Sequence, residues 1–209
     1  DVPIYSDWVG TTEGLVNATI RAQVTGYLIK QNYQEGAFVK KGDVLFEIDA
    51  RPFEAVLAEA EGVLARNQAR WVNAKADLDR IAPLAEANAL SEKELDAAVA
   101  AEGSAQADVQ AARAAVVKAR VDLGFTKITS PIDGIAGIAK AQIGDLVGTP
   151  QGAELTTVST VDPIKVYISA SEQEYLKFMR QLTGREQDLA LDLFLADGNL
   201  YQHKGRFVF

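Results

Sequence analysis

The chain has 209 residues, of which 48% are apolar, so a buried core is expected and wholesale disorder is not. Its net charge of −8 lacks the basic footprint of nucleic-acid-binding domains, so no nucleic acid is expected as a partner. With no cysteine and one histidine, His203, a single copy cannot build disulfides, thiolate sites or a histidine metal site. No run approaches the roughly 18 apolar residues that span a bilayer. The abrupt start at Asp1 and the stop inside a strand-like run at 205–209 lead us to expect further segments at both ends.

The first part of the chain predicts short strands. β-branched runs punctuated by glycine precede Pro52, which is the pattern of strands joined by tight turns. Residues 14–19 are expected to contribute a strand to a β-barrel. Residues 20–51 are expected to form a separate set of short strands, which ends where composition changes sharply at Pro52; a second sharp change lies near Gly124.

The central region, residues 52–124, is rich in alanine and predicts two antiparallel helices. Its inward-facing positions recur at alternating steps of four and three, the 3.5-residue spacing of a coiled-coil seam. Two such rows are mirror images about residue 88, so folding there sets large side chains against small ones. One row is Phe53, Leu57, Ala60, Leu64, Asn67, Trp71, Ala74, Leu78, Ile81 and Ala85, and the other is Ser91, Leu95, Ala98, Glu102, Ala105, Val109, Ala112, Val116, Ala119 and Leu123. Asn67 and the Ala74–Glu102 layer break the apolar pattern and are expected to be wet or locally loose.

The turn between the two helices is also predicted by the sequence. Ser91 and Glu94 fit a capping box at the start of the second helix, and Asn88 suits the end of the first. Pro83 lacks a backbone donor and predicts a kink just below the turn. At about 1.5 Å per residue, some 35 residues make an arm of roughly 50 Å. Such an arm has little core of its own, so it is expected to project from a folded base and reach a partner.

The segment after the helices repeats the segment before them. The corresponding pairs are residues 20–26 and 128–134, Gly36 and Gly144, Val39 and Val147, and, after a two-residue shift, Leu45 and Leu155. A repeat this regular predicts two equivalent halves that pair with each other. The helices leave the first half at Asp49 and return to the second near Thr126, so one small β-domain holds the base of the arm.

The last part of the chain, from Asp162 onward, predicts further strands of the β-barrel. These strands are expected at residues 164–170, 189–195 and 206–209, with a capped short helix at residues 171–180.

Residues 35–49 resemble the half-motif of lipoyl and biotinyl carrier domains. Those carriers present a modified lysine directly after such a segment, but here the chain reads Glu47-Ile-Asp-Ala-Arg51 and the helical arm begins at once. A carrier component is therefore a remote alternative, and no cofactor is expected.

The predicted fold class is α+β and elongated. It consists of a split lipoyl-like β-sandwich (20–51 and 125–160) interrupted by a long antiparallel α-helical coiled-coil hairpin (52–124), plus an incomplete β-barrel domain (1–19 and 161–209).

This order of parts resembles the periplasmic adaptor family, also called the membrane fusion proteins of tripartite efflux pumps. The resemblance covers essentially the whole chain and is densest at residues 21–55 and 123–167. The run Val161-Asp-Pro-Ile164 looks most like adaptors of resistance–nodulation–division transporters. A membrane-proximal domain found in the family is expected to be mostly absent from this chain.

The resemblance implies that the chain is not an enzyme but a bridge. It would join a proton-driven inner-membrane transporter to an outer-membrane channel of the TolC type, for export of drugs or other small molecules. It also implies self-association, with a hexamer as the expected form, and a periplasmic location with an inner-membrane anchor in an N-terminal segment not present here. An adaptor of an ABC or major-facilitator exporter stays open, since those share the lipoyl halves and the hairpin. A hydrolase is discarded because His203 has no nucleophile motif around it, and metal efflux is disfavoured by the lack of methionine, cysteine and histidine clusters.

Family adaptors often carry an arginine, a leucine and a serine at the tip of the hairpin, where they meet the channel. Arg80, Leu84 and Ser91 match that spacing here and are the predicted partner-binding residues. Arg80 can donate a forked pair of hydrogen bonds, and Leu84 supplies an apolar knob. Each also has an ordinary role, as a solvated helix charge, an apolar surface residue and a helix cap. No catalytic, cofactor-binding or metal-binding residue is predicted.

Overall fold

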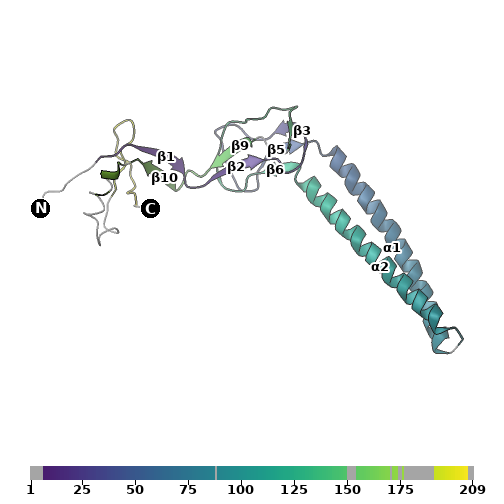
Figure 1. The fold of residues 1–209 in the computed structure, drawn as a ribbon. Coiled ribbons are helices and arrows are strands. Elements are labelled where there is room, and N and C mark those ends of the chain that lie inside the picture. Colours follow the sequence, from purple (N-terminus) through teal and green to yellow (C-terminus); the bar gives the residue numbers. More distant parts are fainter. Residues whose placement is uncertain are drawn as a thin grey trace. The chain divides into compact units, whose positions relative to one another are not determined.

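The computed structural model describes residues 7–87, 89–149, 154–169, 171–173, 176 and 191–206. The chain divides into two compact units, one of Gly14–Ile164 and one of Asp1–Glu13 with Lys165–Phe209. The larger unit holds two long helices and most of the strands (Figure 1). The elements in chain order are β1 (Gly10–Gly14), β2 (Asn17–Arg21), β3 (Gly26–Gln31), β4 (Phe38–Val39), β5 (Val44–Ile48), α1 (Arg51–Glu86), α2 (Glu92–Gly124), β6 (Lys127–Thr129), β7 (Gly134–Ala136), β8 (Leu146–Val147), β9 (Glu154–Ser159) and β10 (Ile164–Ile168).

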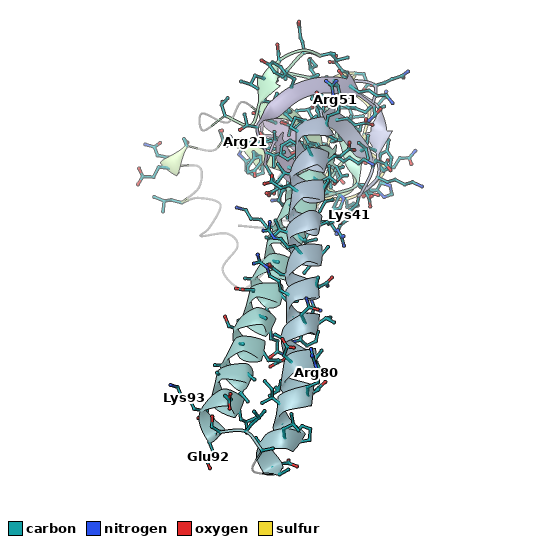
Figure 2. The ribbon with its side chains drawn as sticks, turned by 90° about the vertical axis from the view of Figure 1, so that its right-hand side faces the viewer. Arg21, Lys41, Arg51, Arg80, Glu92 and Lys93 are labelled. Atoms are coloured by element: carbon teal, nitrogen blue, oxygen red, sulfur yellow. The ribbon has the colours of Figure 1, made fainter. Side chains whose placement is uncertain are left out.

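Helices α1 and α2 run antiparallel, side by side, along their whole length (Figures 1 and 2). Pro52 occupies the first turn of α1, where its missing N–H costs no hydrogen bond. The predicted inward faces are confirmed: every residue of the first row is half-buried, and of the second row only Ser91 is exposed. The second row supplies the fully buried residues of the pair, Val109, Ala112, Val116 and Ala119. Large side chains of α1 therefore lie over small ones of α2, as the mirror symmetry predicts.

The polar positions between the helices have partners across the pair. The Trp71 indole Nε1 donates to Glu102 Oε1 at 2.6 Å, and Asn67 Nδ2 donates to the Asp108 carbonyl at 3.3 Å. The Lys75 ammonium lies 5.6 Å from the centre of the Trp71 ring. Asn67 and Glu102, which break the apolar pattern, are therefore hydrogen-bonded across the pair, and the indole reaches Glu102 one layer along it.

Two four-stranded sheets enclose one core in the larger unit, and we call them together the two-sheet domain. Their orders are β2-β9-β7-β4 and β6-β5-β3-β8. The internal repeat relates β2 to β6, β3 to β7, β4 to β8 and β5 to β9, which converts one order into the other. Each sheet thus takes strands from both halves of the repeat, so neither half can form a sheet pair alone.

The core lies between these sheets. Its most buried large side chains are Leu28, Leu45, Phe46, Ile48, Leu155 and Val158. Phe53, in the first turn of α1, packs against the same cluster and so joins the helical pair to the two-sheet domain. Backbone bonds reinforce that junction, since the Ile48 N–H donates to the Thr126 carbonyl at 2.8 Å. The helices leave and re-enter the domain through adjacent strands, β5 and β6.

Glycines at equivalent places in the repeat allow close packing of the chain. A Cβ added to Gly134 would lie 2.3 Å from the Ser159 carbonyl oxygen, and one added to Gly26 would lie 2.5 Å from the Ile48 side chain. Distances this short are closer than van der Waals contact, so a larger residue requires the Ser159 backbone or the Ile48 side chain to move. The repeated glycine therefore marks a close approach of strands in both halves.

The smaller unit contains a two-stranded sheet of β1 and β10. Residues 14–19 were expected to form one strand of this part, which was wrong. The chain turns after β1, and β2 pairs with β9 of the two-sheet domain because Thr160 bonds the backbone of Val16 and holds the turn. The predicted strand at residues 164–170 is confirmed as the shorter β10.

Several expected features fall wholly or partly outside the described residues. They are Asn88 as the end of the first helix, the short helix at 171–180, and parts of the strands at 189–195 and 206–209. Among the described residues of 191–206, isolated bridges pair Leu191 with Gly205 and Phe194 with Leu200.

Candidate functional site

The tip of the helical pair consists of the end of α1 and the start of α2, and each is closed by its own hydrogen bonds. In α1 the Ala87 N–H donates to the Pro83 carbonyl at 3.2 Å, which closes the last turn. Ser91 is the N-cap of α2: its N–H donates to Glu94 Oε2 at 3.0 Å, and its Oγ accepts from the Glu94 N–H at 3.4 Å. The predicted capping box is therefore confirmed.

Electrostatics favour this cap. The backbone N–H of Ser91, and then its hydroxyl, donate to the Glu94 carboxylate and lower the pKa of that group. Glu92 and Glu94 also lie in the first turn of α2, where negative charge interacts favourably with the helix dipole. The tip therefore has a defined second-helix start rather than a frayed one.

Arg80 lies on α1 above the tip and is already engaged within its own helix (Figure 2). Its Nη2 donates to Asp77 Oδ1 at 2.5 Å, and its Nε donates to the Ala76 carbonyl at 3.1 Å. The Arg80 side chain nevertheless remains 74% exposed. Exposed ion pairs of this kind contribute about 0–1 kcal/mol, so a partner can displace Asp77 at little cost.

Leu84 follows Arg80 by one helical turn, which places both on the same side of α1. Its side chain is 48% exposed although it is large and apolar. Ser91 lies across the turn at the start of α2, exposed but occupied by its cap. The structure thus puts Arg80 and Leu84 on one accessible face, and it assigns Ser91 a local structural role.

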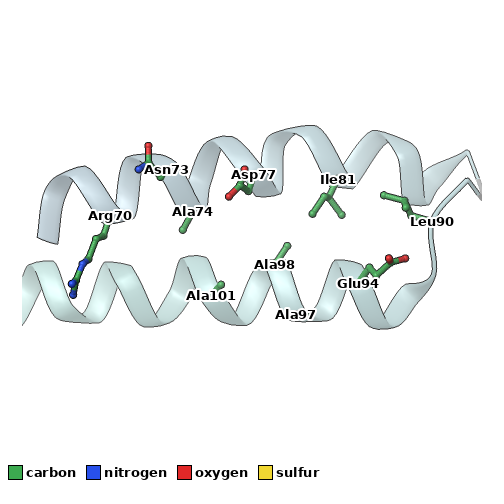
Figure 3. Close-up of a pocket in the computed structure, with 10 residues that line it drawn as sticks. All are labelled: Arg70, Asn73, Ala74, Asp77, Ile81, Leu90, Glu94, Ala97, Ala98 and Ala101. Carbon is green, nitrogen blue, oxygen red and sulfur yellow. The ribbon is translucent and has the colours of Figure 1, made fainter.

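An open groove runs between the helices just below the tip (Figure 3). Its volume is about 690 Å³, and its floor consists largely of alanines from α2 facing Ala74 of α1. Ile81 and Leu90 are its larger apolar residues, and charged groups stand at its edges. The lining residues are Arg70, Asn73, Ala74, Asp77, Ile81, Leu90, Glu94, Ala97, Ala98 and Ala101. The Ala74 layer is therefore locally loose, as expected.

The sequence analysis did not identify this groove. The sequence did carry a signal for it. In the mirror pattern Ala74 lies opposite Glu102, beside Ala98 and Ala101, and small residues that face one another leave space between the helices. Asp77, the partner of Arg80 and a lining residue of the groove, was also missed, although the three-residue spacing on one helix predicts contact.

No metal or catalytic cluster accompanies these features in the part of the chain that the structure describes. Groups of three or more histidine, cysteine, aspartate or glutamate side chains that could hold a metal ion are absent there. Among the described helices, neither α1 nor α2 nor any other combines the length and apolar character needed to cross a membrane.

The helical pair is thus held at its base by the two-sheet domain and exposes both a polar and an apolar side chain, Arg80 and Leu84, near its tip. Residues 16–159 match the family described as "RND MFP, barrel-sandwich hybrid domain". The chain therefore belongs to the resistance–nodulation–division membrane fusion protein family. This is a family of adaptors and not of enzymes, which confirms that prediction.

Curated relatives agree with the family assignment. The chain is 38% identical over 205 residues to membrane fusion protein MtrC of Neisseria gonorrhoeae, covering 96% of this chain and 50% of the relative. It is 34% identical over 213 residues to multidrug resistance protein MdtE of Escherichia coli K12, covering 100% of this chain and 55% of the relative. The chain thus spans about half the length of the curated relatives it matches.

A solved structure shows the same fold. The crystal structure of a MacA–MexA chimeric protein, which contains the α-hairpin domain of Pseudomonas aeruginosa MexA, aligns with a TM-score of 0.68 and 28% identity. The alignment covers 94% of this chain and 64% of the chimera. The mixture of sheets and a helical pair is therefore the fold of known adaptor proteins.

Proposed function

We propose that the chain is part of a periplasmic adaptor of a tripartite efflux pump. It bridges a proton-driven inner-membrane transporter of the resistance–nodulation–division class to an outer-membrane channel of the TolC type, for export of drugs or other small molecules. The observation that carries this proposal is the accessible Arg80–Leu84 face near the end of a helix of 36 residues. At 1.5 Å per residue, that helix extends about 54 Å.

The architecture supports a bridging role. We assign residues 14–51 and 125–164 to a lipoyl-like domain, residues 52–124 to a coiled-coil hairpin, and residues 1–13 and 165–209 to an incomplete β-barrel domain. The spacing of the inward rows supports the coiled-coil assignment, and the two repeated halves of the chain, whose strands interleave in both sheets, support the lipoyl-like assignment. The hairpin occupies the place where a carrier would present its lysine, so the arm substitutes for a cofactor site.

At the tip, Arg80 and Leu84 have separate roles. The Arg80 guanidinium exchanges Asp77 for carbonyl or carboxylate oxygens of the channel, which its planar fork can bind through two hydrogen bonds. Leu84 inserts between apolar side chains of the partner. Ser91 fixes the start of α2 as its N-cap, and its exposed side chain lies within the same contact with the channel.

A contact limited to two helix ends has little area and therefore low affinity. Several copies acting together overcome this weakness through avidity. We therefore propose a ring of adaptors, six in number by family resemblance, held in the periplasm by an inner-membrane anchor. Among transporter classes, membership of this family favours a resistance–nodulation–division partner over an ABC or major-facilitator exporter.

Site-directed photocrosslinking in cells tests the bridge. A photoreactive residue replaces Leu84, and a matched variant carries it at Val72, which is 59% exposed on the same helix. We expect Leu84, but not Val72, to capture an outer-membrane channel protein. Capture of only inner-membrane or soluble proteins from Leu84 would show that the assignment of the tip's partner is wrong.

A further inference from the structure

Asp77 belongs to two features at the end of the helical pair. Its Oδ1 accepts a hydrogen bond from Arg80 Nη2 at 2.5 Å, and its side chain also lines the groove between α1 and α2 (Figure 3). The Asp77 side chain is 59% exposed, so a partner can reach it from solvent. One carboxylate therefore connects the Arg80–Leu84 face with the groove.

The Arg80 side chain is turned back along α1, away from the tip. Its two acceptors are Asp77 and the Ala76 carbonyl, and both lie nearer the base of the helical pair than Arg80 itself. Leu84 lies on the other side of Arg80, one turn closer to the tip. A partner that binds the Arg80 guanidinium at the tip must therefore compete with Asp77 for it.

The end of the helical pair is acidic. Residues 76–97 contain six acidic and two basic side chains, so their net charge of −4 is half of the −8 carried by the whole chain. Within the groove, Asp77 and Glu94 lie toward the tip, and Arg70 lies toward the base. A basic group complements the tip end of the groove, and complementary charge guides both the choice of partner and its orientation.

The floor of the groove allows another helix to approach closely. It consists largely of alanines from both helices, and about 690 Å³ is open above them. The distance between two packed helices depends on the size of the side chains at their contact, so small residues permit a short one. The groove therefore suits the end of a helix that brings a small apolar face and a basic side chain.

We propose that Asp77 selects the channel segment that binds the tip, by accepting a lysine or arginine from the C-terminal end of a channel helix seated in the groove. The incoming cation replaces the Arg80 guanidinium at Asp77. Arg80 then donates its hydrogen bonds to carbonyl oxygens of the same helix end. This inference rests on the proposed function, since the channel supplies the helix.

The C-terminal end of a helix offers both groups that this exchange needs. Its last four carbonyls have no partner within the helix, and basic side chains are favoured in its last turn. One pairing at Asp77 is thus replaced by another, and neither Asp77 nor Arg80 loses a partner. A segment without a cation would leave Asp77 competing for Arg80, so Asp77 determines specificity.

Photocrosslinking in cells tests the occupant of the groove. A photoreactive residue replaces Asn73, at the edge of the groove, and the matched control carries it at Val72, which is exposed on the same helix but does not line the groove. We expect Asn73, but not Val72, to capture the channel, with the crosslink mapping within about one helical turn of a lysine or arginine. Capture from Leu84 without capture from Asn73 would overturn this inference and leave the proposed bridge intact. No capture from either position would refute the bridge, and the inference with it.

Substitutions at Asp77 test its role through the yield of channel capture from Leu84. Asp77→Asn should lower the yield about five-fold, the effect of losing a well-formed exposed ion pair, and Asp77→Lys should lower it further. The control Asp79→Lys makes the same charge change on α1 outside the groove and should have less than about a two-fold effect, because salt screens distant charges. Circular dichroism checks that each variant stays helical.

A charge reversal on the channel completes the test. Replacing the mapped lysine or arginine by glutamate should restore capture by the Asp77→Lys variant, which a purely structural role of Asp77 does not predict. If Asp77 only restrained Arg80, both Asp77 substitutions would raise the yield. Such a rise, or equal losses from Asp77→Lys and Asp79→Lys, would overturn the proposal.

Discussion

Replacing Val116 by aspartate tests the packing between the two helices. Val116 is 8% exposed in α2, whereas its neighbour Val117 is 62% exposed and serves as a control in the same helix. Valine and aspartate have similar helix propensities, so the two variants differ mainly in burial. Exposing an apolar side chain of this size costs about 1.5 kcal/mol. Placing an unpaired polar group between the helices adds about 1–3 kcal/mol.

Together these effects predict a loss of about 3 kcal/mol for Val116→Asp and less than about 0.5 kcal/mol for Val117→Asp. Arg113 and Arg120 lie three and four residues from position 116, but helix-surface ion pairs return only about 0.2–0.5 kcal/mol. In a chain of 209 residues this corresponds to a midpoint lower by roughly 6–12 °C. Thermal unfolding followed by helical circular dichroism measures it. An unchanged Val116→Asp, or an equal loss in both variants, would refute the proposed seam.

Three further outcomes are expected. Gly134→Ala should destabilise the two-sheet domain by about 2 kcal/mol or more, measured by chemical denaturation, because the added Cβ would lie 2.3 Å from the Ser159 carbonyl oxygen. The control Gly62→Ala, whose added Cβ would lie in open space on α1, should not destabilise the protein. Arg80→Asp should abolish drug export in cells without loss of helicity, whereas loss of helicity would mark a structural role. The hydrogen bonds from the Arg51 side chain lower the pKa of Asp49 from 3.8 to about 2. The stability from this pair should be complete above pH 4 and lost as pH falls from about 4 to about 2, and Arg51→Gln should return the pKa toward 3.8 in an NMR titration.

The helical pair was predictable in detail because its signal is local and periodic. Spacing identified the inward faces, and the mirror symmetry identified which residues oppose each other. The spacing could not show how far a long side chain extends along the pair. Trp71 bonds Glu102 one layer away, and this contact depends on rotamers rather than on position in the repeat.

The two-sheet domain was predictable in content but not in strand order. The repeat indicated two equivalent halves, yet a periodic strand pattern does not show whether a strand pairs with a strand of its own half or of the other half. The assignment of residues 14–19 failed for a related reason, since β2 continues a run of similar composition whose pairing with β9 is set by tertiary contacts.

At the tip, the cap at Ser91 followed from a local rule and is confirmed, whereas the binding role of Arg80 and Leu84 stays a prediction. The structure of a single chain does not contain the contacts that these two residues would make with a partner. The ion pair between Arg80 and Asp77 was within reach of the sequence, because residues three apart on a helix are neighbours.

The interleaving of the two sheets has a consequence for how the chain acquires its fold. Strands β5 and β6 are adjacent in space but separated by the whole helical segment, so pairing them requires closure of a long loop. Closure of an unstructured loop of that length is entropically unfavourable and slows folding. Once α1 and α2 associate, their bases lie together, and the ends of β5 and β6 meet as if joined by a short turn. The arm that reaches outward for a partner is thus also the element that brings the two halves of its own base together during folding.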